Sequence, residues 1–295
     1  MLWAVFTIIA AAAQTARNAM QRELTTTLGT VGATHVRFLF GFPFALIFLA
    51  AVCLVTDSGL PTPSLAYWPW IAIGLVGQIV ATALMLAAMN DSSFVVTTAY
   101  IKTEPVQTAL FGLVLLGDRL TPMLALAIII ATAGVVMMAF KPAAAKANGV
   151  RPAIKGIVAG GLFGLSAIGF RGAILSLDIP GQFVLASTFT LAVGLVVQAA
   201  LLSAYLVVRE PQVLRAIFKV WRPSMLAGFM GAFASQFWFL GFSIASAASV
   251  RTLALVEVLF AQGVTKFAFK QQTSLREVLG IVMIIAGVVL LIWAH

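Results

Sequence analysis

The sequence predicts an all-α membrane protein whose ten transmembrane helices form two inverted five-helix repeats. Three observations lead to this prediction. Of the 295 residues, 62% are hydrophobic and only 9% are charged, whereas a soluble domain carries about 25% charged residues. Ten apolar stretches approach or exceed the roughly 20 residues that a membrane span needs. The chain also repeats itself, because Glu104 recurs as Glu257 and Ala133–Val136 recurs as Ala286–Val289.

Short polar loops separate the apolar stretches. The longest polar loops cover 141–155 and 208–223, and the first lies at the centre of the chain. It separates a first repeat, 1–142, from a second repeat, 153–295. The ten expected helices are 2–20, 31–55, 68–89, 93–116, 121–140, 155–176, 181–207, 224–245, 247–269 and 275–294. The N-terminal stretch has no basic segment before it, so we expect it to be the first span and not a removable signal.

The repeat predicts inverted topology. An offset of 153 positions, the separation of Glu104 and Glu257, places helices three to five on helices eight to ten. Because each repeat has five helices, consecutive copies enter the membrane from opposite sides. The expected result is a pseudo-two-fold axis in the membrane plane, an arrangement common in transporters.

Basic residues predict the orientation of the chain. Thirteen Lys and Arg residues lie in one set of loops and only Arg119 lies in the other. Positive loops stay in the cytoplasm, so both termini are expected outside it. This expectation reverses if one span has been miscounted.

Several short motifs occur in the order seen in one transporter group. They are Arg37-Phe38, Pro105, the turn Gly117–Thr121, and the paired Gly134 and Gly287. The chain resembles the drug/metabolite transporter superfamily, and within it the EamA-type ten-helix permeases. The aromatic amino-acid exporters of that superfamily are nearest in architecture.

This resemblance covers the whole length and implies a transporter in a bacterial inner membrane. The second repeat departs from the pattern, because Lys270–Thr273 stands where the acidic turn belongs. Many relatives keep their termini in the cytoplasm, which disagrees with the charge count. We follow the charge count, since it belongs to this sequence.

Ionisable residues lie inside several expected spans, and Lys102, Glu104 and Glu257 are the deepest of them; the others are Arg37, Arg171 and Arg251. A charge at the bilayer centre costs about 2.5–3.5 kcal/mol on insertion scales, so each needs a partner in the bundle. Lys102 and Glu104 are two positions apart on a helix and point to different sides. If helices four and nine cross on the pseudo-axis, Glu257 approaches Lys102 and Arg251 approaches Glu104.

Two interpretations of these charges remain open from the sequence alone. They are structural ion pairs that join the repeats, or they line the path of a substrate. The candidate substrate-binding residues are Glu104, Glu257, Lys102, Arg251, Gln78, Gln236, Tyr100 and Trp238.

Other polar and helix-breaking residues have expected structural roles. Pro105 should kink helix four beside Glu104, and Arg37 should contact helix backbone or a carboxylate. Arg17 and Arg171 lie near helix ends, where long cationic side chains reach the membrane surface.

The preferred function is secondary transport by alternating access, with an exported amino acid as the expected substrate. The carboxylates suit an ammonium group, and the cations suit a carboxylate. The alternatives are a lipid flippase or scramblase and an exporter of another metabolite or drug. We expect no enzyme, because no nucleophile–base pair is evident, and no ATP-binding loop.

We also expect no cofactor and no metal site, since the chain has one Cys and two His residues. The expected partners are a small-molecule substrate and membrane lipid, without nucleic acid, and the protein is expected to act as a monomer.

Overall fold

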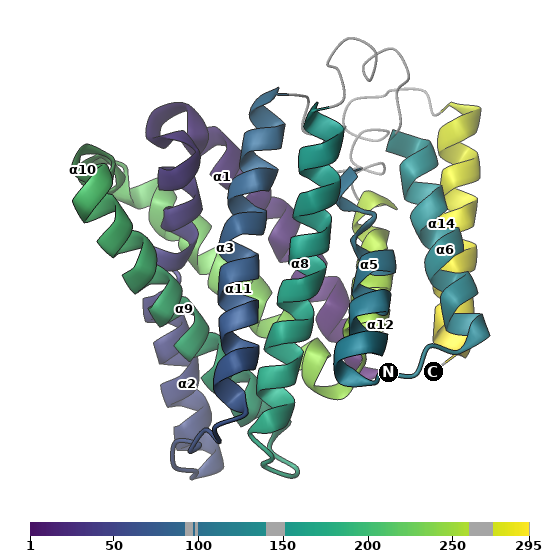
Figure 1. Ribbon diagram of the computed structural model, residues 1–295, viewed down its shortest axis with the longest axis horizontal. Coiled ribbons are helices and arrows are strands. Elements are labelled where there is room, and N and C mark those ends of the chain that lie inside the picture. The colour runs from purple at the N-terminus through teal and green to yellow at the C-terminus, as the bar shows by residue number, and fades with distance from the viewer. Residues whose placement is uncertain (92–96, 98–99, 140–150, 260–273, 295) are drawn as a thin grey trace.

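The protein is a bundle of α-helices in the computed structural model, which describes residues 1–91, 97, 100–139, 151–259 and 274–294 (Figure 1). The described elements are α1 (Leu2–Leu39), α2 (Phe42–Thr56), α3 (Tyr67–Asp91), α5 (Glu104–Phe111), the π-helical turn η1 (Gly112–Leu116), α6 (Pro122–Ala139), α8 (Arg151–Ser176), α9 (Phe183–Arg209), α10 (Pro211–Lys219), α11 (Trp221–Ile244), α12 (Ala247–Leu253), the 3-10 turn η2 (Ala254–Val256) and α14 (Leu275–Trp293).

The helices have the length and composition of membrane spans. Among the described residues, six helical stretches are long and apolar enough to cross a bilayer, and two shorter apolar helices accompany them. The protein is therefore a multi-pass membrane protein. The start of α1 and the end of α14 lie at the same end of the bundle (Figure 1). Parts of the fourth and ninth expected helices, 93–116 and 247–269, lie outside the described residues.

The first two expected helices differ from the structure in their bounds. The sequence predicts a helix that ends at residue 20, but α1 remains helical to Leu39 with a kink at Gly29. Gly29 has φ 67°, a left-handed conformation that a residue without Cβ adopts at no steric cost. The expected helix 31–55 is interrupted at residues 40 and 41. Pro43 lies in the first turn of α2, and because proline has no N–H it cannot continue the preceding helix.

Three extensive interfaces build the bundle: α3 with α8, α1 with α11, and α6 with α14. Each joins a helix from the first half of the chain to one from the second half. Under the expected repeat, α3 corresponds to α11 and α1 corresponds to α8. The interface of α3 with α8 is thus the repeat-related equivalent of the interface of α1 with α11. The third interface joins α6 to its own equivalent in the second repeat, α14.

The interface between α6 and α14 is reciprocal at the level of single residues. A Cβ placed on Gly134 would lie 2.8 Å from the carbonyl oxygen of Gly280, and a Cβ on Gly287 would lie 2.8 Å from that of Ala127. The offset that relates Gly134 to Gly287 also relates Ala127 to Gly280. Small residues let the two backbones approach this closely.

A stripe of glycines on α8 holds α5 and the residues before it. Gly156, Gly160 and Gly164 are spaced one turn apart. A Cβ on Gly160 would lie 2.7 Å from the carbonyl oxygen of Ile101, and one on Gly164 would lie 2.6 Å from Thr108 Oγ1. This close approach fixes the position of the charged residues that lie between Ile101 and Thr108.

The turn that joins η1 to α6 depends on the backbone conformation of Gly117. This residue has φ 67° and no atom within 4 Å of an added Cβ, so an alanine here meets strain but no clash. We expect Gly117→Ala to lower the free energy of unfolding by about 1 kcal/mol. Gly59→Ala is the matched control, because Gly59 is equally uncrowded and has no positive φ. The midpoints of thermal unfolding in detergent test this, and equal shifts in the two variants would contradict it.

Candidate functional site

The fourth helix is interrupted where its charges lie. Lys102 and Thr103 form a turn, and α5 begins at Glu104. Pro105 lies in the first turn of α5, where its missing N–H costs no helical hydrogen bond. The sequence predicts a kink at this proline, whereas the structure ends one helix and starts another. Lys102 and Glu104 are both buried, with 7% and 5% of their surface exposed.

The ninth helix is irregular at the equivalent positions. It starts as α12, where Ser246 Oγ accepts a hydrogen bond from the Ser249 N–H at 3.2 Å. It then tightens into the 3-10 turn η2 before Glu257. Irregular backbone at membrane depth is tolerated only where protein or a water-filled cavity covers it. Discontinuous helices of this kind form the binding sites of many transporters.

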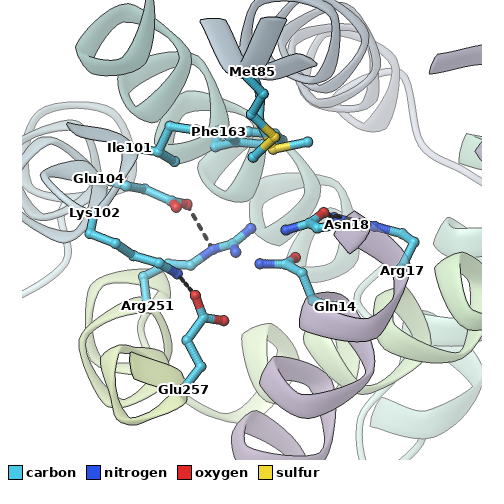
Figure 2. Close-up of a pocket in the computed structure, with 11 residues that line it drawn as sticks. Gln14, Arg17, Asn18, Met85, Ile101, Lys102, Glu104, Phe163, Arg251 and Glu257 are labelled. Atoms are coloured by element: carbon cyan, nitrogen blue, oxygen red, sulfur yellow. Dashed lines mark hydrogen bonds and ion pairs between the residues drawn. The ribbon is translucent and has the colours of Figure 1, made fainter. Parts of the chain in front are cut away.

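Two ion pairs connect the interrupted helices (Figure 2). Glu104 Oε1 lies 3.0 Å from Arg251 Nε, and Lys102 Nζ forms an ion pair with Glu257 Oε1. Both pairings are the ones that the sequence predicts. In the first pair the Arg251 Nε–H is not directed at the carboxylate, and neither atom has a hydrogen-bond partner. This pair therefore retains unused hydrogen-bonding capacity.

An aromatic ring and an amide support the Arg251 side of the site. The Arg251 guanidinium lies 4.3 Å from the centre of the Trp238 ring, a distance at which ring and cation attract. Trp238 Nε1 donates a hydrogen bond to Gln14 Oε1 at 3.0 Å. These contacts hold the guanidinium between α11 and α1.

A small cavity lies between these side chains. Its volume is about 20 Å³, which is room for about one water molecule. The lining residues are Gln14, Arg17, Asn18, Met85, Met89, Ile101, Lys102, Glu104, Phe163, Arg251 and Glu257.

Three other sequence candidates lie away from this cavity. Gln78 Oε1 accepts a hydrogen bond from Gln198 Nε2 at 3.1 Å, which joins α3 to α9. Gln236 Nε2 donates to Thr188 Oγ1 at 2.8 Å, which joins α11 to α9. Tyr100 packs against Gly156 of α8.

Arg37 is buried among hydroxyl groups. Its Nη1 lies 3.4 Å from Thr82 Oγ1, and its Nη2 lies 3.2 Å from Ser235 Oγ. The sequence predicts a backbone or carboxylate partner for Arg37, and that prediction is wrong. The hydroxyls of α3 and α11 occupy the positions around its guanidinium.

The sequence predicts that Arg17 reaches the membrane surface, but the structure buries it in the bundle; Arg171 is partly exposed and pairs with Asp118 in the loop after η1. Arg17 is 1% exposed and donates to Asn18 Oδ1 at 2.6 Å through Nη2. Arg171 donates through Nη1 to the carbonyl oxygens of Phe242 and Ala245, the latter at 2.6 Å. Those carbonyls belong to the C-terminal end of α11, which carries a partial negative charge and attracts a cation.

The sequence contains a signal for the missed part of the site. Gln14, Arg17, Asn18 and Gln21 follow the spacing of one helical face. A polar stripe in an apolar span indicates a face turned to the bundle interior. The signal lies in the spacing of the four residues, and none of them carries it alone.

The apolar spans, the interrupted helices and the buried charges define a multi-pass membrane protein with a polar centre. Residues 1–140, just under half of the chain, match the EamA-like transporter family. That family consists of transporters, so the match indicates a membrane transporter of small solutes. No curated protein matches the sequence.

A solved structure shares the fold over the whole length. It is described as the crystal structure of a protein, and it aligns with a TM-score of 0.67 at 17% identity. The alignment covers 97% of this chain and 95% of that chain. The fold is thus shared beyond the residues that match the family. Within the described residues, no group of three or more His, Cys, Asp or Glu side chains gathers to hold a metal ion.

Proposed function

We propose that this protein is a secondary transporter that exports an amino acid by alternating access between two inverted five-helix repeats. One observation carries the proposal. Two glutamates at equivalent positions, Glu104 and Glu257, each contact a cation from the opposite interrupted helix at one cavity. The site offers both signs of charge, as a zwitterion requires.

Binding exchanges the internal ion pairs for pairs with the substrate. The ammonium group of an amino acid takes the place of a cation beside Glu104 or Glu257, and its carboxylate takes the place of a glutamate beside Lys102 or Arg251. Because the cavity holds about one water molecule, the ion pairs separate before the substrate enters. Each charge then regains a partner, so the exchange avoids the cost of leaving a buried charge alone.

The reciprocal helix contacts support the two-repeat mechanism. Gly134 contacts Gly280 where Gly287 contacts Ala127, and the interface of α1 with α11 matches that of α3 with α8. A two-fold relation of this kind lets the repeats exchange roles as the site opens to either side.

Charge distribution supports cytoplasmic basic loops and termini on the opposite side. Helix α10 carries the exposed Arg215 and Lys219, and it lies at the end of the bundle away from both termini (Figure 1). The excess of cations near that end favours the cytoplasmic side.

Counterflow in proteoliposomes tests the proposal. Vesicles loaded with one unlabelled amino acid at a time are expected to accumulate the same labelled amino acid, with and without a pH gradient. Protein-free vesicles are the control. A fluorescent-lipid assay on the same vesicles tests the flippase alternative. Lipid movement without exchange of any amino acid would contradict the proposal.

A further inference from the structure

The buried charges of the site do not balance. Around the cavity, Lys102 and Arg251 are matched by Glu257 and Glu104. Arg17 also lines the cavity and is 1% exposed. The described residues of the site therefore carry a surplus of positive charge, and a zwitterion with no net charge leaves that surplus unchanged.

A second buried cation lies beside Arg17. Gly231 of α11 separates the two side chains, since a Cβ placed on it would lie 3.4 Å from Arg17 Cδ and 3.1 Å from Arg37 Cγ. Arg37 is 2% exposed, and within the described residues its hydrogen-bond partners are two hydroxyl groups. Two guanidinium groups thus lie close together inside the membrane.

Among the described residues, no carboxylate side chain forms an ion pair with Arg17 or Arg37. All nine acidic residues lie within the described part of the chain. Two are the glutamates of the site. The other seven are solvent-exposed, paired with other cations or placed at helix ends: Glu23, Asp57, Asp91, Asp118, Asp178, Glu210 and Glu277. An anionic group from another molecule would supply a charge that the paired carboxylates of the chain do not.

Arg17 has the free donor that such a molecule needs. Its Nε and Nη2 donate to Asn18 Oδ1, at 3.2 and 2.6 Å. Its Nη1 is buried and has no hydrogen-bond partner. A buried donor without a partner destabilises the protein, and more so when it is charged. An anionic group bound at Nη1 removes this cost, and hydrogen bonds to charged groups are the stronger kind.

We propose that Arg17 binds a second acidic group of the substrate, so that the transporter prefers amino acids with an acidic side chain to neutral ones. This inference rests on the proposed function. The α-carboxylate and α-ammonium groups occupy the places of the internal ion pairs, and the side-chain carboxylate reaches Arg17 on α1. Arg37 lies behind Arg17 and strengthens the positive field.

Near-isosteric substrates that differ in charge test the inference. Glutamate against glutamine, and aspartate against asparagine, are compared in counterflow at equal concentration. Wild type is expected to exchange each acid at least about tenfold faster than its amide, as one charge-assisted hydrogen bond allows. Arg17→Gln is expected to bring the acid-to-amide ratio close to one. Arg215→Gln, on the exposed face of α10, is the matched control and should keep the wild-type ratio.

The outcomes separate this inference from the proposed function. Equal exchange of acids and amides by wild type would overturn the inference and leave amino-acid transport standing. Exchange of no amino acid would overturn the proposed function.

A second measurement does not need the variant to fold. Glutamate should raise the unfolding midpoint of wild type more than glutamine does at the same ionic strength. If chloride alone raises it as much as glutamate, Arg17 holds an inorganic anion and the inference is wrong.

Discussion

Glu104→Gln and Glu257→Gln proteins are each expected to exchange amino acids at least about tenfold more slowly than wild type. Each change removes an acceptor for the ammonium group and leaves a buried cation without its counter-charge. A hydrogen bond to a charged group contributes about 1.5–3 kcal/mol, and each 1.4 kcal/mol is a factor of ten. Counterflow in proteoliposomes at matched protein content measures the effect.

The control for this prediction is Glu23→Gln, the same change at an exposed position of α1. It should exchange at the wild-type rate.

Glu104→Gln leaves Arg251 in contact with the rings of Trp238 and Phe242, so this variant should yield more folded protein than Glu257→Gln. Wild-type exchange by both glutamine variants would show that the carboxylates do not take part in transport.

Lys102→Met is expected to lower the free energy of unfolding by about 3–5 kcal/mol, because the buried Glu257 then loses its ion-pair partner. The double variant Lys102→Met/Glu257→Gln should recover most of that loss, since neither charge is left. Denaturation in mixed detergent micelles measures wild type, the two single variants Lys102→Met and Glu257→Gln, and the double variant.

The exposed ion pair of Lys155 and Asp91 is the matched comparison. Its side chains are 35% and 42% exposed, and an exposed pair contributes about 0–1 kcal/mol. Lys155→Met should therefore change stability little. Additive losses in the Lys102→Met/Glu257→Gln protein would mean that the two side chains do not stabilise each other.

The sequence predicts the buried charges of the site well because its repeat places them. Glu104 and Glu257 share one offset, so their helices are expected to be counterparts that cross. The cations then lie opposite the carboxylates, as the structure shows. Helix positions follow from apolar length alone, which is why most expected spans match described helices.

The hydrogen-bond partners of other polar side chains depend on which sides of two helices pack together. A single sequence does not show which sides these are. Gln78 pairs with Gln198 of α9, and no offset relates the two. Arg17 lies near the end of the expected first helix, but α1 continues to Leu39, so Arg17 is in the interior. The change of direction at Gly29 is a backbone property of one glycine in a polar stretch, which periodicity does not reveal.

The size of the central cavity has a consequence for energy conservation. A space of about 20 Å³ does not hold a continuous file of water, and protons cross membranes along such files. We therefore expect this cavity to conduct no protons in the conformation described. Copies at rest in that conformation would then not lower the proton-motive force that drives other transporters.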